Sequence, residues 1–282
     1  MAMTERRGEI GPDKFLSLAI RRLGEFPDLD YAKTWSTIQA GKAKDGNRRA
    51  AGVLLLFGCQ ERMDGDIFVY LIKRSRRVSQ GGDISCPGGM LAPRLDSFIK
   101  VLIDFYFLPV MTGQPRRYAR RRGKETFNLI TLFLGNALRE TWEEVGLSPW
   151  SVKFLGPLPT YSLYTLERTI FPLVGWIRKP WSARPSKEVD KVFKVPLEAF
   201  FAQGNYAHFS ITSDYDTSYH QELPAFIVRD EDGNQEILWG ATFNIVTRFL
   251  KLVFDFSLPE ISKEASFHRI LTPEYITGNK DL

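Results

Sequence analysis

The sequence predicts an α+β fold in which a mixed β-sheet lies between α-helices. Short continuous apolar runs at 51–57 and 67–72 are typical of buried strands. Apolar residues at helical spacing over 12–26, 127–145 and 241–254 predict amphipathic helices. The two kinds of element alternate irregularly along the chain, and this order favours a mixed sheet covered by helices.

The N-terminal half begins with a helix over Pro12–Phe26, since proline is favoured at the first helical position. Residues 27–48 are polar and irregular, so no element is predicted there. The strands at 51–57 and 67–72 flank Met63-Asp-Gly-Asp66, which is typical of a hairpin turn.

The C-terminal half carries several short strand patterns before the last helix. Strands are predicted at 152–158, 169–177, 192–195, 225–228 and 237–238. Pro196 begins a turn of helix through Phe201, and Asp232-Gly233 indicates a hairpin between the last two strands. The chain is therefore divided into an N-terminal extension 1–48, one domain 49–258 with an insertion at about 92–135, and a tail 259–282.

Composition limits the kinds of protein this can be. A chain of 282 residues with 44% hydrophobic residues can bury one large core, and its net charge of +5 suits an anionic ligand. Cys59 and Cys86 form no disulfide framework and no zinc-type spacing, which favours a reducing, cytoplasmic location. No apolar run reaches the length of a transmembrane segment, and no signal peptide is evident.

An acidic face near the end of the 127–145 helix carries the main chemical signal. Glu140, Glu143 and Glu144 lie at i, i+3 and i+4, so their carboxylates share one side of the helix and repel one another. Arg139 can neutralise one of them, and a divalent cation can neutralise the rest, since Mg²⁺ prefers hard oxygen ligands. Taken alone, the cluster could also be a solvated acidic face.

The segments around this face resemble a known signature. Pro87-Gly88-Gly89, followed by Arg139-Glu-Thr-Trp-Glu-Glu-Val-Gly-Leu147, resembles the Nudix hydrolase motif G-x5-E-x7-R-E-U-x-E-E-x-G-U, where U is bulky and apolar. The match is split by the insertion at 92–135. The first Glu of the motif is missing, because Leu95 stands there counting from Gly89, and Thr131 counting back from Arg139.

A second resemblance covers about Val53–Leu252 and points to the coenzyme A pyrophosphatase branch of that family. Leu71-Ile-Lys-Arg-Ser75, Gly82 and Pro87-Gly88-Gly89 are similar to its first motif, although Cys86 replaces a Phe. Later segments agree in order: Leu155–Leu158, Phe171–Gly175, Glu188–Leu197 and Leu238–Thr242.

The resemblance implies a Nudix fold and metal-dependent hydrolysis of a pyrophosphate bond in a nucleoside diphosphate derivative. The expected substrate is coenzyme A or acyl-CoA, giving 3′,5′-ADP and (acyl-)4′-phosphopantetheine, with Mg²⁺ or Mn²⁺ as cofactor. The alternatives are another pyrophosphate, such as ADP-ribose, a dinucleotide polyphosphate or a nucleotide sugar, or a non-catalytic Nudix module that senses a ligand.

The resemblance also assigns residues. Glu140, Glu143, Glu144 and the carbonyl of Gly88 or Gly89 are the expected metal ligands, and Arg139 is expected to orient Glu143. Substrate phosphates are assigned to Arg74, Arg76 and Arg77. A further carboxylate from a later loop is expected, and the candidates are Asp214, Asp216 and Glu222.

The insertion is the most individual part of the sequence. Phe98–Met111 is apolar and aromatic, and Arg116–Lys124 is strongly basic. This pair of segments could pack on the core, form a homodimer interface, close over a pocket, or lie on an anionic membrane. We expect it to shape substrate access or a subunit interface and to supply no metal ligand. Nucleic acid is not expected as a partner.

Overall fold

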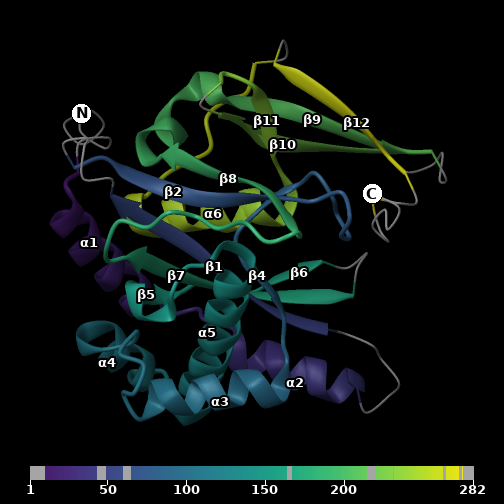
Figure 1. Ribbon diagram of the computed structural model, residues 1–282. Coiled ribbons are helices and arrows are strands. Elements are labelled where there is room, and N and C mark those ends of the chain that lie inside the picture. Colours follow the sequence, from purple (N-terminus) through teal and green to yellow (C-terminus); the bar gives the residue numbers. More distant parts are fainter. Residues whose placement is uncertain are drawn as a thin grey trace.

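The computed structural model describes residues 10–42, 49–59, 65–163, 167–214, 220–230, 232–262, 265–272 and 275. A central sheet lies between helices on its two faces, and a second, smaller sheet stands at one end (Figure 1). The predicted α+β class, with a mixed sheet between helices, is confirmed.

The helices and strands have the following bounds. The helices are α1 Pro12–Glu25, α2 Tyr31–Lys42, α3 Pro93–Asp104, α4 Gly113–Arg121, α5 Lys124–Val145 and α6 Gly240–Phe254. The central sheet contains β1 Arg49–Cys59, β2 Ile67–Arg74, β3 Ile84–Ser85, β4 Gly88–Met90, β5 Val152–Pro157, β6 Tyr161–Leu163, β7 Arg168–Ile177 and β8 Val189–Pro196. The second sheet contains β9 Tyr206–Ser213, β10 His220–Arg229, β11 Gln235–Leu238 and β12 Ser266–Leu271.

The central sheet runs in the order β3-β2-β1-β7-β5, while β4 pairs with β1, β6 with β7 and β8 with β2. The sheet is mixed because β1 and β7 are parallel and its other pairs are antiparallel. The second sheet has the order β11-β10-β9-β12, and β12 lies parallel to β9.

Strand β1 shows why its sequence is a continuous apolar run. Leu55 and Phe57 face one core, to which α1 and α6 contribute, whereas Leu54 and Leu56 face the other, formed with α2 and α5. A strand buried on both faces needs apolar residues at every position. Helices therefore cover both sides of the sheet, and α5 is fixed directly against it.

The prediction that residues 27–48 are irregular is wrong for Tyr31–Lys42, which form α2. Tyr31 is fully buried, and its hydroxyl donates to the carbonyl of Pro172 at 2.6 Å. Ile38 is buried about two turns later, so the stripe that fixes the helix is narrow. The sequence shows no clear apolar periodicity here, because few apolar residues lie among the polar ones. Packing of these few residues against the core stabilises the helix.

Two regions assigned to the ends of the chain contact the rest of the fold. Helices α1 and α2, from the segment 1–48, supply Phe15 and Tyr31 to the two cores. Strand β12, from the segment 259–282, completes the second sheet. Among the described residues, no helix has the length and apolarity that a bilayer crossing requires.

Candidate active site

Helix α5 carries the three glutamates in its last two turns. Its buried side packs on the sheet, where the rings of Phe133 and Phe171 stack with centroids 3.8 Å apart. The helix ends at Gly146, whose φ of 71° is left-handed and suits glycine at this position. The acidic turns are therefore held rigidly at one edge of the central sheet.

Strand β4 brings the Gly88–Gly89 backbone against these carboxylates. The amide of Gly88 donates to Glu144 Oε2 at 2.9 Å. A Cβ on Gly89 would lie 2.5 Å from Glu140 Oε2, and one on Gly88 would lie 2.5 Å from the Cα of Val53 in β1. Glycine is required at both positions because neighbouring atoms fill the space a side chain would need. Gly88–Met90 form the short strand β4, which pairs with β1.

Arg139 connects the other carboxylates. Its Nη1 donates to Glu143 Oε2 at 2.8 Å, and its Nη2 lies 2.8 Å from Glu140 Oε1. The structure thus places Arg139 beside Glu143, as the resemblance implied, and also beside Glu140. A guanidinium bound on several sides is held in one orientation, so it fixes the carboxylates it contacts.

Asp96 is a member of this cluster that the sequence analysis missed. It lies in the first turn of α3, is fully buried, and its Oδ1 accepts from Arg139 Nε at 2.8 Å. Its Oδ2 accepts from the amide of Ala92 at 2.6 Å. Asp96 stands one residue after Leu95, where the resemblance expects a glutamate. The signal was an acid in the first turn of a helix inside the insertion, one position out of register.

The carboxylates carry more negative charge than their partners neutralise. Burial raises the pKa of Glu144 to about 8. The negative charge of Glu140 raises this pKa as well, whereas the hydrogen bond from the Gly88 amide and the positive charge of Arg74 lower it. Burial also raises the pKa of Glu140. Hard oxygen ligands with excess negative charge fit Mg²⁺ or Mn²⁺. Across the described ranges, no group of three or more Asp, Glu, His or Cys side chains is already gathered around one point.

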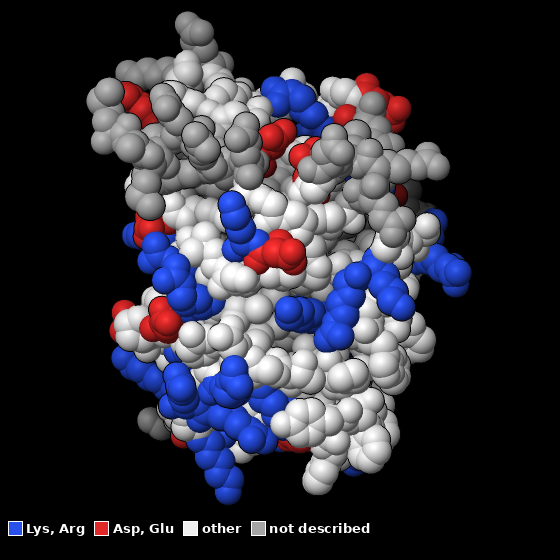
Figure 2. Space-filling view, turned by 90° about the vertical axis from the view of Figure 1, so that its left-hand side faces the viewer, with Lys and Arg blue, Asp and Glu red and all other residues white. Residues whose placement is uncertain are grey.

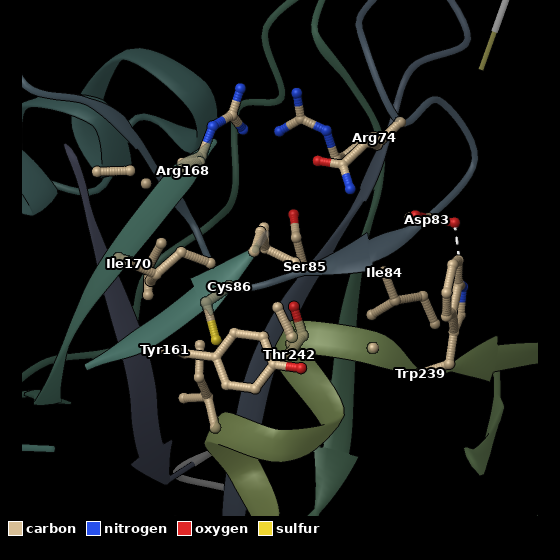
Figure 3. A pocket seen from close by; sticks show the side chains of 18 of the residues that line it. Arg74, Asp83, Ile84, Ser85, Cys86, Tyr161, Arg168, Ile170, Trp239 and Thr242 are labelled. Atoms are coloured by element: carbon tan, nitrogen blue, oxygen red, sulfur yellow. Dashed lines mark hydrogen bonds between the residues drawn. The ribbon is translucent and has the colours of Figure 1, made fainter. Parts of the chain in front are cut away.

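A cavity of about 350 Å³ lies beside the Gly88–Gly89 segment. Figure 3 shows its walls coming from β1, β3, β7 and the start of α6, with Tyr161 and Cys86 near Thr242. Its lining combines apolar groups such as Ile170 and aromatic groups such as Trp239 with a few charged ones. A mostly preformed cavity with few, well-placed polar groups is typical of a small-molecule site.

Two arginines stand at one end of this cavity. Figure 3 shows the guanidinium groups of Arg74 and Arg168 pointing toward one another. Burial lowers the pKa of Arg168, and the charges of Arg74 and Arg49 lower it further. Within the described part of the chain, Arg168 Nε has no hydrogen-bond partner, and neither Arg74 nor Arg168 forms an ion pair. This end of the cavity therefore favours an anion. No sequence motif pointed to Arg168.

The other predicted substrate arginines lie elsewhere. Arg76 and Arg77 line a separate hollow together with Ser186 and Lys187. The carbonyl of Glu188 accepts from the amide of Ser75, which ties the segment between the two hollows to β8. The structure thus brings Arg74, and not Arg76 or Arg77, to the cavity beside Gly88.

Of the three predicted additional carboxylates, the two that the structure describes do not contact the glutamates. Asp214 is exposed just beyond β9, and Asp216 lies outside the described residues. Glu222 is exposed on β10, and its neighbours Gln221 and Leu223 line the cavity, so strand alternation turns Glu222 away from it. The charge of Glu188 instead contributes to the raised pKa of Glu144.

A second buried carboxylate, Asp83, lies in the cavity wall beside Arg74, and its main-chain carbonyl accepts from the amide of Arg74. Its Oδ2 accepts from the hydroxyl of Tyr275 at 2.6 Å, and its Oδ1 accepts from Arg269 and, at 3.2 Å, from Trp239 Nε1. Tyr275 and Trp239 both line the cavity. Asp83 therefore ties the segment around β12 to the wall of the site.

Comparison with known proteins gives similarity in structure only. No protein-family model matches the chain, and no curated protein matches its sequence. A MutT/nudix family protein from Enterococcus faecalis has a TM-score of 0.42 and 13% identity, over 80% of this chain and 73% of that one.

Two further solved structures cover about half of this chain. A NUDIX hydrolase from Alicyclobacillus acidocaldarius has a TM-score of 0.37 and 17% identity, over 53% of this chain and 79% of that one. The Ap4A hydrolase of C. elegans, in a binary complex, has a TM-score of 0.33 and 15% identity, over 53% of this chain and 81% of that one. Identities this low say nothing of the substrate of this chain.

Proposed function

We propose that this protein is a metal-dependent pyrophosphohydrolase of the Nudix type. One observation carries the proposal: Glu144 and Glu140 meet the Gly88–Gly89 backbone beside a cavity with two arginines at one end, and neither arginine forms an ion pair within the described ranges. A pyrophosphate needs cations on its oxygens and a site for an attacking water, and this arrangement offers both. A solvated acidic face would not bury Glu144 to 5% exposure.

Each group has a role in this reaction. Glu140, Glu143, Glu144 and the carbonyl of Gly88 or Gly89 would hold Mg²⁺ or Mn²⁺. The ion, when bound, supplies an activated water and neutralises developing charge. Arg139, held by Asp96, keeps Glu140 and Glu143 in position. Arg74 and Arg168 bind phosphate oxygens and so orient the substrate.

The substrate we propose is coenzyme A or an acyl derivative. The ordered segments from Leu71 to Thr242 support this choice, and so does the pair Arg74 and Arg168. Coenzyme A carries a 3′-phosphate in addition to its pyrophosphate, so it needs one more cation than ADP-ribose does. A cavity with two separate guanidinium groups can meet that need.

A substrate panel with Mg²⁺, scored by product mass, tests the proposal. It should include coenzyme A, dephospho-coenzyme A, acetyl-CoA, ADP-ribose, a diadenosine polyphosphate and a nucleotide sugar. We expect 3′,5′-ADP and 4′-phosphopantetheine from coenzyme A, with slower turnover of dephospho-coenzyme A. Cleavage of another pyrophosphate with coenzyme A untouched would overturn the substrate but not the reaction. Ligand binding without any cleavage would instead identify a sensing module.

A further inference from the structure

Helix α3 is apolar on both sides, although only one side is covered. Ile103 is buried, and Ile99 packs with it against the core that contains α5. Leu95, Phe98 and Val101 lie on the opposite side and are exposed. Large apolar side chains rarely form one exposed patch on a monomer, so the side of α3 that carries Leu95, Phe98 and Val101 is an uncovered contact surface.

The turn after α3 extends this surface with aromatic side chains. Phe105 and Phe107 are 70% and 71% exposed, and Tyr106 between them is 53% exposed. The next residues are firmly anchored, because Leu108 and Val110 are buried at 2% and 1%. The aromatic tip is therefore presented by a fixed turn.

Arg116, from α4, holds this tip in place. It is buried, and it donates to the carbonyls of Ile103 at 3.1 Å and Asp104 at 2.8 Å. Its guanidinium lies 4.2 Å from the centre of the Tyr106 ring. Tyr106 has a φ of 63°, a left-handed conformation that is unfavourable for a non-glycine residue. Several contacts thus maintain an arrangement that leaves three aromatic rings in solvent.

Helix α4 places positive charge beside the same tip. Arg117, Arg120 and Arg121 of α4 are exposed, as is Lys124 at the start of α5, and none of them forms an ion pair with another described residue. Figure 2, which faces the side of α1 and α4, shows a cluster of Lys and Arg next to an uncharged area at the lower edge of the molecule. No acidic residue interrupts the sequence from Gly113 to Lys124.

We propose that the outer side of α3, the Phe105–Phe107 tip and the basic side of α4 together dock on a bilayer that contains anionic phospholipids. Aromatic and aliphatic side chains would enter the interface while the arginines contact lipid phosphates. Charge favours this occupant over a second copy of the chain. A two-fold interface places the same patch on both partners, so the positive surfaces of two α4 helices would be brought together.

Flotation of the purified full-length protein with vesicles tests this proposal. The vesicles are phosphatidylcholine alone or phosphatidylcholine mixed with phosphatidylserine. We expect binding to the mixed vesicles that weakens as salt is raised. The double variant Phe105→Ser/Phe107→Ser should lose binding while thermal unfolding and pyrophosphate hydrolysis stay unchanged, since neither residue contacts the glutamates or the cavity.

Two double variants that each remove two positive charges distinguish contact at α4 from a general effect of net charge. Arg117→Gln/Arg121→Gln should lower partitioning roughly 30-fold, because each basic residue near an anionic surface contributes about 1 kcal/mol. Lys194→Gln/Lys251→Gln removes the same charge from β8 and α6 and should change partitioning little. Equal effects of the two pairs, or equal binding to both kinds of vesicle, would overturn the proposal.

Sedimentation velocity without vesicles tests whether a second copy of the chain covers this surface instead. If the wild type is a dimer and Phe105→Ser/Phe107→Ser is a monomer, a second copy covers the surface and the membrane proposal fails. Hydrolysis by all variants is measured in parallel, so inactivity of the wild type would count against the proposed function and leave the docking result intact.

Discussion

Asp96 and Asp83 are both buried carboxylates, and in the sequence they flank the Gly88–Gly89 segment. Asp96 binds Arg139, which in turn contacts Glu140 and Glu143. Asp83 binds Arg269, Tyr275 and Trp239, and it contacts none of the glutamates. Each carboxylate lies close to the glycine segment in the sequence, but its partners come from distant parts of the chain.

The difference between them lies in what their partners do. The partner of Asp96 positions the glutamates that we propose as metal ligands, so changes there should lower kcat. The partners of Asp83 form cavity walls, so changes there should raise KM and lower stability. Two buried aspartate–arginine pairs can therefore have different roles: one positions side chains for the reaction, and the other shapes the wall that the substrate contacts.

The largest expected effect is that of Glu144→Gln, which lies on the metal side. An amide cannot supply a carboxylate ligand, so kcat should fall on the order of 10³-fold. Burial already raises the pKa of Glu144 to about 8, so the folded protein without metal tolerates a neutral group there. Steady-state kinetics and the shift of Tm on adding Mg²⁺ measure both effects. Glu125→Gln, an exposed change on the same helix, is the control.

Asp96→Asn should come next, with a fall in kcat of about 10- to 100-fold, the usual cost of losing a group that orients a metal ligand. KM should change less, and the Mg²⁺ concentration needed for half-maximal rate should rise. Asp104→Asn, at the other end of α3 where Asp104 pairs with Lys100, is the matched control. A pure KM effect in Asp96→Asn would remove the distinction between the two sides.

Arg168→Gln should act on the cavity side by raising KM for coenzyme A about 10-fold, since a charge-assisted hydrogen bond contributes about 1.5–3 kcal/mol. Its kcat should remain close to that of the wild type. Arg49→Gln removes a nearby exposed charge that does not line the cavity, and should leave KM within about twofold. If both variants raise KM equally, Arg168 acts only through the overall positive charge of this region and not through contact with the substrate.

Arg269→Gln should have the smallest effect. It removes one of three donors to Asp83, at a cost of about 1–3 kcal/mol for the less satisfied buried carboxylate. Tm should fall by several degrees and KM should rise a few-fold, with kcat retained. Arg248→Gln, an exposed change on α6, provides the baseline. A loss of kcat without loss of stability would place Asp83 on the catalytic side after all.

The regular elements were predictable where a periodic pattern met a clear boundary. Helix α5 was expected over 127–145 and spans Lys124–Val145, because its apolar stripe and Gly146 are both visible in the sequence. Strands β4, β6, β9 and β12 were not predicted. Strands β4 and β6 have 3 residues each, too few to show alternation, and in β9 and β12 histidine and serine interrupt the apolar residues.

The glutamates and Arg74 could be found from local spacing, but their partners could not. Asp96 is one residue out of register within a long insertion, and Arg168 begins a strand without any motif. Asp83 is an unremarkable acid in a glycine-rich loop until Arg269 and Tyr275 arrive beside it. Such groups are defined by contacts between distant segments, which one sequence does not reveal.

The hydrogen bonds of Asp83 also affect the order in which parts of the protein fold. Its partners lie 156, 186 and 192 residues further along the chain. Contacts at such separations close large loops and form late, after local helices and hairpins. Helix α5 and its acidic turns can therefore be in place while Asp83 still faces water. We expect the substrate pocket to be among the last parts of the native state to form during folding, and among the first to open.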